Sequence, residues 1–559
     1  MNGTPLGITV EPVGGVGEMG HHHLALDLGP DSFLLDCGIL MPGPLDPGIN
    51  RITPSFEPAL ARAAAGSLRA LLLTHGHLDH IGAVPDLLAR IPDLPVYGTP
   101  WTLALVRRRL DREDVPLAAK PDLRTVEPGA DVSIGEATAT WLRVTHSLPD
   151  ACSVAVRSSA GCVVHSGDFR VQDDPLLGPP SDIAGLRRVG EQGVDLALVD
   201  STSSGAPGST EPERVIAQRL QEAIRSVPGY VVVTLFSSHL ERLWACVLAA
   251  RATGRRVCVL GRSLRETVDL ARERGVLPLD PGELLPSDDL ETTPRQEVLL
   301  VVTGTQGEWR TPLARMARGE DSLVSLGPGD HVFWSARVIP GEERAVGAVV
   351  NRLVDRGVTV VPPWGRRAAP LHTSGHARWD EVARWLGWVR PRHVLPIHGE
   401  PWHLQVHRSA LEEHLEPGRV LDLRSGQRLH REEPDADWVV DGAPLREPTL
   451  HAGSGVAFEM TDRALAHRRR AARAGAMTVL VGWTPDAVGA LEVMTIGVVP
   501  DERRLRFDAE VTSALREELA GRRPARDDAD RREQVRLLAR AAVRVRTGTK
   551  PVCVVRLLS

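Results

Sequence analysis

The residues best suited to chemistry lie in one short segment, His-Gly-His-Leu-Asp-His at residues 75–80. Four of its six side chains are imidazoles or carboxylates, the usual protein ligands of zinc and manganese. An apolar run at 71–73 precedes the segment and predicts a buried strand that ends where the ligands begin. So many donors in so few residues cannot easily all bind one tetrahedral ion together with ligands from elsewhere. The spacing therefore favours sharing of the four donors between two metal ions.

Later apolar runs also lead to ligand-type residues. Runs that begin at positions 141, 162 and 394 lead to histidine, aspartate and histidine, and the run at 196–199 ends in Asp200. The candidate metal ligands are His75, His77, Asp79, His80, His146, Asp168 and His398. Such a set suits two divalent ions bridged by one carboxylate, with room for a water or hydroxide. Two ions about 3.5–4 Å apart lower the pKa of a bridging water and neutralise charge on a phosphoryl group, so the set predicts hydrolytic chemistry.

The chain after Asp200 alternates between helix and strand patterns. We expect strands at 230–235, 257–260, 298–303 and 332–335, and helices at 211–226, 239–253, 263–274 and 342–356. This alternation is typical of a parallel, doubly wound sheet. Ligands of such sheets bind at the carboxyl ends of the strands, where the turns 236–239, 261–263 and 303–308 would lie.

The two ends of the chain carry weaker patterns. The glycine-rich loop at 14–20 lacks the Gly-Lys-Ser/Thr ending of a phosphate loop, and the histidines at 21–23 are expected to be strand residues near a site or the surface. Helices are expected at 81–91 and 101–115. Towards the C-terminus we expect two arginine-rich helical stretches, at 461–474 and 511–543, and strands at 477–483 and 551–557.

Composition sets limits on the class of protein. The 559 residues are enough for three domains, and 42% hydrophobic and 25% charged residues are ordinary for globular proteins. No apolar run approaches the ~20 residues of a membrane span, and the first residues lack a signal-peptide pattern. The six cysteines form no Cys-x-x-Cys pair, which favours reduced thiols in a cytoplasmic protein. The net charge of −6 does not announce a nucleic-acid partner, although a local groove can be basic on an acidic protein.

The order of these motifs resembles a known family. The chain is similar to the β-CASP nucleases of the metallo-β-lactamase fold, and among them to bacterial ribonuclease J, over roughly residues 8–430. The resemblance rests on GGVGEMG (14–20), DCG (36–38), HGHLDH (75–80), THSLPD (145–150), HSGDF (165–169), DST (200–202), TGTQGE (303–308), IPGE (339–342), TSGH (373–376) and PIHGE (396–400). The match of the C-terminal part is weaker.

The resemblance implies a role for each motif residue. One ion would be held by His75, His77 and His146, the other by Asp79, His80 and His398, and Asp168 would bridge them. Asp36 would brace the ligand loop from outside. Catalytic roles would fall to Asp79, Asp168, Asp200 and His376, the last contacting the scissile phosphate or protonating the leaving 3′ oxygen. The substrate-binding residues would be Phe236, Ser237, Ser238, His239, Arg262, Ser263, His372, Thr373, Ser374, Gly375 and His376.

The resemblance also implies the architecture and the partners. The fold would be an αββα metallo-β-lactamase sandwich with an inserted doubly wound α/β β-CASP domain and a small α+β C-terminal domain. The expected limits are 1–200 and 366–430 for the sandwich, 201–365 for the insertion, 431–447 for a linker and 448–559 for the C-terminal domain. We expect two divalent ions, zinc or else manganese, an RNA substrate with a 5′-monophosphate, 5′-to-3′ exonuclease and endonuclease activity, a homodimer or homotetramer, and no membrane association.

Some positions depart from the family pattern. Leu78 replaces a usual acidic residue, His239 replaces an asparagine, and a structural cation site near Asn50 and Asp441 lacks the usual aspartate at position 50.

Three other functions compete with an RNA phosphodiesterase. A β-CASP nuclease acting on DNA would use the same hydrolytic motifs, a small-molecule hydrolase such as a lactonase or β-lactamase would not need the insertion, and a non-catalytic scaffold in RNA decay would not need all seven ligands.

Overall fold

The computed structural model describes residues 7–42, 49, 51–112, 120–339, 341–364, 371–433, 436–443, 449–452, 458–459, 462–483, 488–520, 522 and 527–558. Contacts divide the chain into two compact units, residues 1–40 with 53–448 and residues 41–52 with 449–559. Within the described residues, no helix is long and apolar enough to cross a membrane.

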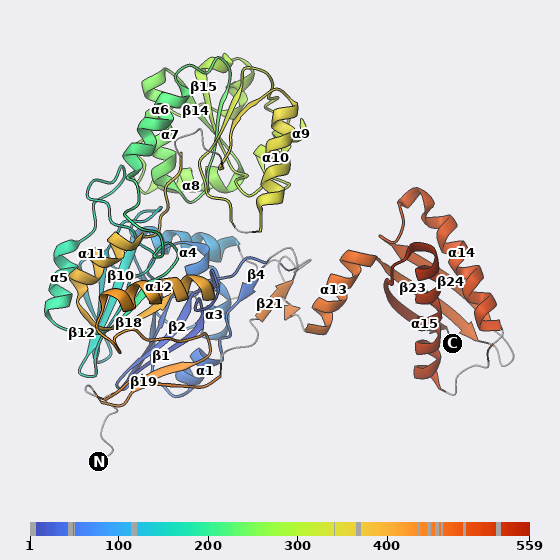
Figure 1. The fold of residues 1–559 in the computed structure, drawn as a ribbon, viewed down its shortest axis with the longest axis horizontal. Helices are drawn as coiled ribbons and strands as arrows, with labels where there is room; N and C mark the ends of the chain where they lie inside the picture. Colours follow the sequence, from blue (N-terminus) through green and yellow to red (C-terminus); the bar gives the residue numbers. More distant parts are fainter. Residues whose placement is uncertain are drawn as a thin grey trace. The chain divides into compact units, whose positions relative to one another are not determined.

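Two sheets face each other in the larger unit (Figure 1). One has the order β20-β19-β1-β2-β3-β5-β6-β7 and the other the order β18-β12-β11-β10-β9-β8. The strands of the first are β1 (Ile8–Gly14), β2 (His23–Leu28), β3 (Asp31–Leu35), β5 (Leu68–Leu72), β6 (Val96–Gly98), β7 (Leu123–Thr125), β19 (Arg428–Arg431) and β20 (Val439–Asp441). Those of the second are β8 (Asp131–Ile134), β9 (Ala137–Arg143), β10 (Cys152–Ser158), β11 (Gly161–His165), β12 (Val194–Asp200) and β18 (Pro391–Ile397). Their inward side chains, such as Leu26, Trp141 and Leu198, form one buried apolar core.

Helices cover the outer face of each sheet, which completes the predicted αββα sandwich. The outer face of the first sheet packs against α1 (Glu57–Ala64), α2 (Leu78–Ile81), α3 (Val84–Arg90) and α4 (Pro100–Arg112). The second packs against α5 (Ile183–Glu191), α11 (Trp379–Val389) and α12 (Pro401–His414). The single helix expected at 81–91 is wrong, because the chain forms α2, turns at Gly82 and Ala83, and starts α3 with Pro85 in its first turn. Proline suits that position because the first turn of a helix needs no N–H donor.

The predicted insertion is a separate parallel sheet of order β14-β15-β13-β16-β17 (Figure 1). Its strands are β13 (Val231–Thr234), β14 (Arg256–Leu260), β15 (Val298–Val302), β16 (His331–Trp334) and β17 (Thr359–Val361). Its helices are α6 (Glu213–Ile224), α7 (Leu240–Thr253), α8 (Arg262–Glu273), α9 (Pro312–Arg318) and α10 (Glu343–Asp355), with 3-10 turns η1 (Ser287–Glu291) and η2 (Arg295–Glu297). Every neighbouring pair of strands is parallel, and helices contribute to the apolar cores on both faces. The sequence did not predict α9 and β17.

The chain returns from the insertion to the sandwich through β18. This strand pairs in parallel with β12, the strand that precedes the insertion, and Ile397 lies opposite Asp200. The residues that directly follow the two strands therefore emerge side by side at the same edge of the sheet.

The smaller unit contains the sheet β24-β23-β25, made of β23 (Ala476–Trp483), β24 (Val488–Ile496) and β25 (Val552–Leu558). It also contains β21 (Thr449–Ala452) and β22 (Phe458–Glu459), which share a sheet with β4 (Arg51–Thr53), and the helices α13 (Asp462–Ala474), α14 (Asp501–Ala520) and α15 (Asp528–Thr547). The helical stretch expected at 511–543 contains parts of two helices, and Gly521 and Pro524 lie between them in the sequence. The strand β24 was not predicted. The small α+β class of this domain is as predicted.

Candidate metal centre

The candidate ligands all follow strands at one edge of the sandwich. The segment at 75–80 follows β5 and enters α2, His146 follows β9, Asp168 follows β11, and His398 follows β18. His398 has a left-handed backbone, with φ of 56°, a conformation uncommon for residues other than glycine. The structure therefore brings together residues that are more than three hundred positions apart in the chain.

Asp168 lies at the centre of these residues, and its side chain is almost fully buried. Its Oδ2 atom lies 3.6 Å from His75 Nε2, 3.3 Å from His80 Nε2 and 3.9 Å from His146 Nε2. Its Oδ1 atom lies 3.2 Å from His398 Nε2. One carboxylate thus faces imidazole nitrogens from every ligand-bearing segment.

The other donors form two groups around this carboxylate. In the first donor group (His75, His77, His146), His77 Nδ1 lies 3.2 Å from His75 Nε2 and 3.1 Å from His146 Nε2. In the second donor group (Asp79, His80, His398), Asp79 Oδ2 lies 3.8 Å from His80 Nε2 and 3.6 Å from His398 Nε2. The donor atoms of the first group together with Asp168, and those of the second group among themselves, lie close enough together to hold one ion.

Several of these atoms have no hydrogen-bond partner among the described residues. They are His80 Nε2, His398 Nε2 and Asp168 Oδ1, and all three are buried. A buried polar atom without a partner is costly, and a metal ion that accepts its lone pair removes that cost. The donor set, imidazole with carboxylate, fits zinc or manganese.

Hydrogen bonds to the opposite ring nitrogens orient the ligands. Asp36 Oδ2 accepts a hydrogen bond from His80 Nδ1 at 2.8 Å and another from the Thr74 hydroxyl, also at 2.8 Å. The Thr74 oxygen in turn lies 3.0 Å from His75 Nδ1. His146 donates from Nδ1 to the carbonyl of Gly375 at 2.7 Å. These bonds engage Nδ1 of each ring and leave Nε2 as the nitrogen available to a metal ion, which is how such outer partners set the tautomer of a metal-binding histidine.

The electrostatics of the centre separate the two donor groups. Burial lowers the pKa of all three histidines of the first group, that of His77 to about 4, which favours the neutral form that binds metals. Burial also lowers the pKa of His80, but the carboxylates of Asp168, Asp36 and Asp79 outweigh it and raise the pKa to about 10. Negative charge therefore predominates around the second group, and a divalent cation bound there would neutralise it.

Asp200 and His376 form a pair at the rim of this centre. His376 Nδ1 lies 2.8 Å from Asp200 Oδ2 and 3.9 Å from Asp168 Oδ2. Burial lowers the pKa of His376, but the attraction of Asp200 and Asp168 is stronger and raises it overall. His376 is partly exposed whereas Asp200 is buried, so the imidazole is the member of the pair that an outside molecule can reach.

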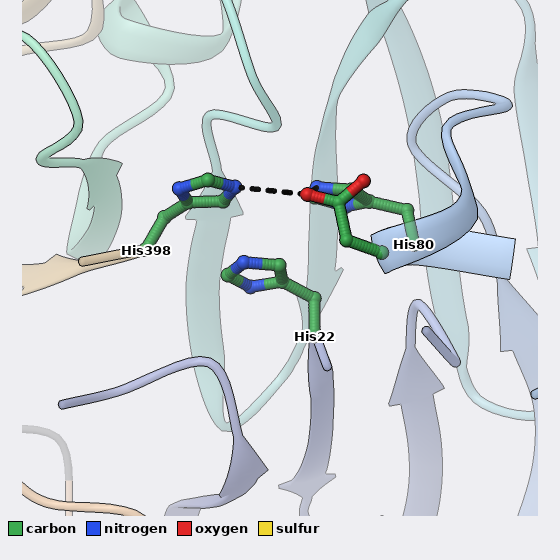
Figure 2. A group of neighbouring side chains, drawn as sticks. His22, His80 and His398 are labelled. Carbon is green, nitrogen blue, oxygen red and sulfur yellow. Dashed lines mark ion pairs between the residues drawn. The ribbon is translucent and has the colours of Figure 1, made fainter. Parts of the chain in front are cut away.

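The sequence did not single out His22 as a site residue, although it placed the histidines at 21–23 near a site or the surface. The structure stacks its ring against two members of the second donor group, with centroids 3.9 Å from that of His398 and 4.5 Å from that of His80 (Figure 2). The side chain is fully buried. The only signal in the sequence was the position of the histidine directly before β2, next to the glycine-rich loop.

The residues expected to bind substrate fall into three places. The turn from Thr373 to His376 borders the centre, where the Ser374 hydroxyl accepts a hydrogen bond from the His376 amide at 3.1 Å. Phe236, Ser237 and Ser238 form the partly buried turn after β13. His239 is buried and faces inward, with Nε2 3.3 Å from Glu213 Oε1. Arg262 and Ser263 are exposed in the first turn of α8, and among the described residues no contact joins them to the metal centre.

The family's structural cation site would lie near Asn50 and Asp441. Asn50 lies outside the described residues. Asp441 Oδ2 lies 3.3 Å from His430 Nε2.

A buried network of charged residues joins the insertion to the centre. Arg170, two residues after Asp168, lies 3.3 Å from Glu213 of α6 and 2.6 Å from Glu241 of α7. Arg170 also donates to the carbonyl of Ser374 at 3.3 Å. Arg242 donates to both carboxylate oxygens of Glu213 at 2.9 and 2.8 Å. The network therefore ties the first two helices of the insertion to the turn that carries His376.

Arg242 also fixes the start of that turn. It donates to the carbonyl of Leu371 at 2.8 Å and to the hydroxyl of Ser335 at 2.6 Å. His372, the next residue, is largely buried, and burial together with the positive charge of Arg242 lowers its pKa well below the ordinary value. His372 therefore remains neutral beside the network.

Comparison with known proteins agrees with this arrangement. Residues 33–251 match the metallo-beta-lactamase superfamily, 228–353 the beta-CASP domain of ribonuclease J, and 367–420 the Zn-dependent metallo-hydrolase RNA specificity domain. Ribonuclease J of Sinorhizobium meliloti is 31% identical over 97% of this chain and 96% of its own length. The ribonucleases J of Mycolicibacterium smegmatis and Mycobacterium tuberculosis are 38% and 37% identical, over 72% and 70% of this chain and 70% and 69% of theirs.

A solved structure shares the fold. The crystal structure of a protein of unknown function from Enterococcus faecalis V583 superposes with a TM-score of 0.53 at 15% identity, covering 76% of this chain and all of that one. At this level of identity the likeness concerns the fold alone.

The buried network predicts how stability depends on pH. Burial raises the pKa of Glu213, but the attraction of Arg242, His239 and Arg170 outweighs it and holds the pKa well below the ordinary value of 4.5. A depressed carboxyl pKa stabilises the fold above the unfolded-state pKa, and this stability is lost as the pH falls through the folded-state value. Glu213→Gln should lower the free energy of unfolding at pH 7 by about 3–5 kcal/mol, because it leaves buried guanidinium groups uncompensated.

The matched control is Glu211→Gln, the same substitution two residues earlier. Glu211 forms a surface pair with Arg219, and the loss of such a pair costs about 0.2–1 kcal/mol. Urea unfolding from pH 7 down to pH 3 should show the stability gap between wild type and Glu213→Gln narrowing with acid. A gap that stays constant across this range would contradict the ionised state of Glu213.

Proposed function

This chain belongs to the ribonuclease J family, and from this membership we propose how its residues divide the work of cleaving RNA. The protein is a metal-dependent ribonuclease, a phosphodiester hydrolase that binds divalent ions at a dinuclear centre. The observation that carries the proposal is the position of Asp168 between two groups of metal donors.

We propose that the first donor group holds one ion, the second donor group holds the other, and Asp168 bridges them. The two bound ions supply a hydroxide near neutral pH and neutralise charge on the phosphate. Zinc is the proposed metal and manganese the alternative, because five imidazoles and two carboxylates suit both and the order of affinities favours zinc. Asp36 holds His80 and, through Thr74, His75 in the binding orientation.

His376 acts on the substrate rather than on the metals in this proposal. Its Nδ1 atom lies 2.8 Å from Asp200 and 3.9 Å from Asp168, so the ring borders the centre and would lie beside a phosphate bound there. Asp200 holds Nδ1 and leaves Nε2 to protonate the leaving 3′ oxygen or to contact the phosphate. Backbone amides and hydroxyls of the turn from Thr373 to His376 suit the binding of phosphate oxygens.

Finer properties are proposals that rest on the family. We propose 5′-to-3′ exonuclease and endonuclease activity, a preference for 5′-monophosphorylated RNA, and domain limits of 201–365 for the insertion. A cytoplasmic location is supported by six free cysteines, five of them buried. Assembly into a homodimer or homotetramer through residues 448–559 is supported by the exposed apolar side chains of Met494, Ile496 and Val554 on the sheet of the smaller unit.

The double variant Asp79→Ala with His80→Ala tests the metal assignment. It should reduce the bound metal from two ions per chain to one or none and slow RNA cleavage by more than about 100-fold. Loss of a residue that hydrogen-bonds to a ligand typically costs about 10–100-fold in activity, and loss of the ligand itself should cost more. Elemental analysis and a cleavage time course measure both effects. Asp288→Ala with His414→Ala, two exposed residues of the same types, is the control. Unchanged RNA cleavage in the ligand variant would refute the catalytic assignment.

RNA labelled at either end tests the choice of substrate. With a 5′-monophosphate, we expect stepwise release of nucleotides from the 5′ end. A 5′-triphosphate should block this release and leave only internal cuts, because a pocket that fits one terminal phosphate excludes the larger group. DNA of the same sequence and 5′ phosphate should be cut more slowly. Equal cleavage rates for 5′-monophosphorylated and 5′-triphosphorylated RNA would refute the proposed preference for a 5′-monophosphate. Faster cleavage of DNA than of RNA would favour the DNA nuclease alternative.

His376→Ala should separate catalysis from metal binding. General acid catalysis typically contributes 10²–10⁴-fold, so we expect a fall in kcat of about 10²–10⁴ with the metal content unchanged. A substrate with a better leaving group should recover part of the rate, because it needs less protonation. If the variant instead loses an ion, His376 belongs to the metal centre and the assignment is wrong.

A further inference from the structure

The ring of His22 lies in a parallel stack with two proposed ligands. Its plane is inclined by 4° to that of His398 and by 11° to that of His80, and the two ligand rings are inclined by 13° to each other. Figure 2 shows His22 below the gap between the other two rings. Both of its ring nitrogens are buried and have no hydrogen-bond partner among the described residues.

The proximity of His22 invites assignment as a further metal ligand. One of its ring nitrogens lies within 4.8 Å of a donor atom of each member of the second donor group. The ring orientation opposes this assignment. An imidazole binds a metal through a lone pair in the plane of its ring. The rings of His22 and His398 overlap face to face with centroids only 3.9 Å apart, so their lone pairs lie in separate parallel planes and do not converge on one ion. The rings of His80 and His398 are also nearly parallel, but their centroids are 5.5 Å apart and both Nε2 atoms approach Asp79 Oδ2, at 3.8 and 3.6 Å. When His398 directs its lone pair at the ion, the parallel ring of His22 presents its face.

The backbone around His22 fixes this orientation. The His22 amide donates to the Asp79 carbonyl at 2.9 Å, and the Gly38 amide donates to the His22 carbonyl at 2.8 Å. Gly15, with φ of +83°, lies against the edge of the ring, where a Cβ atom would meet His22 Nδ1 at 2.4 Å. The ring therefore lies between the glycine-rich loop and the ligands, and the Asp79 carbonyl couples its backbone to the ligand segment.

We propose that His22 is a positioning residue, an aromatic floor that holds the rings of His80 and His398 in a common orientation toward the ion without binding the ion itself. This inference rests on the ligand assignment of the second donor group proposed above. Contact with the flat face restricts rotation of His398, which arrives from β18 on a strained backbone and has its other nitrogen 2.7 Å from the Thr202 hydroxyl. The floor and the Thr202 hydroxyl together leave that ring one orientation.

The cobalt-substituted protein tests this inference, because the visible absorption bands of Co²⁺ report the number and type of its ligands. The variants are His22→Phe, which keeps the aromatic face, His22→Leu, which fills the space without aromaticity, and His22→Ala, which empties it. None of the three carries a lone pair. We expect His22→Phe to retain the bands and the affinity for Co²⁺. His22→Ala should retain the band positions but bind more weakly by about 10–100-fold, the usual effect of losing an outer partner.

Bands that shift in every variant that folds would overturn the inference, because they would show that a nitrogen ligand is lost. Unchanged affinity in His22→Ala would also overturn it, because the floor would then have no effect. Thermal melting identifies which variants fold, and any one that folds decides the ligand question. His331→Phe is the control. The His331 ring stacks on Phe333, and in the sequence His331 is far from every proposed ligand. His398→Ala must shift the bands, and failure there would refute the ligand assignment itself.

Discussion

The pairing of β12 with β18 is the constraint on which the rest of the structure depends. Asp200 ends one strand, Ile397 ends the other, and the register places them opposite each other. His398 therefore lies beside a centre whose other proposed ligands precede residue 200. The whole insertion is built between these two strands, so the last ligand reaches the site only when the chain has returned from the insertion.

Buried charged residues fix the position at which the chain returns from the insertion to the centre. Arg170, Glu213, Glu241 and Arg242 are removed from water, and buried ion pairs contribute little net stability compared with apolar packing. What they provide is a fixed geometry, since any displacement of the insertion would leave a guanidinium or carboxylate without its partner. The carbonyls of Leu371 and Ser374 accept from the same two arginines, so the turn that presents His376 is fixed by the inserted domain.

Sequence patterns predicted the elements better than the contacts between them. Apolar runs that lead to histidine or aspartate located the seven candidate donors, because the strands that precede them, β5 of one sheet and β9, β11 and β18 of the other, end at the same edge of the sandwich. Periodicity could not show that His239 faces Glu213, since the direction of a residue at a helix start depends on its partners. It also missed β24, and it did not separate α14 from α15 because arginine-rich stretches resemble one another on either side of a break. His22 was overlooked as a site residue because its role comes from ring orientation, which spacing does not encode.

The two kinds of support around the centre act on different degrees of freedom. Hydrogen bonds donated by the ring Nδ1 atoms to Asp36, Thr74 and Gly375 fix the tautomers, and so determine which nitrogen of each ring carries the lone pair. Such bonds leave a ring free to tilt about the axis that joins its two nitrogens. A face-to-face contact, such as that of His22 with His398, opposes this tilt. A ligand that arrives from the distant strand β18 has more need of both restraints than His75, which belongs to the same short segment as its neighbours.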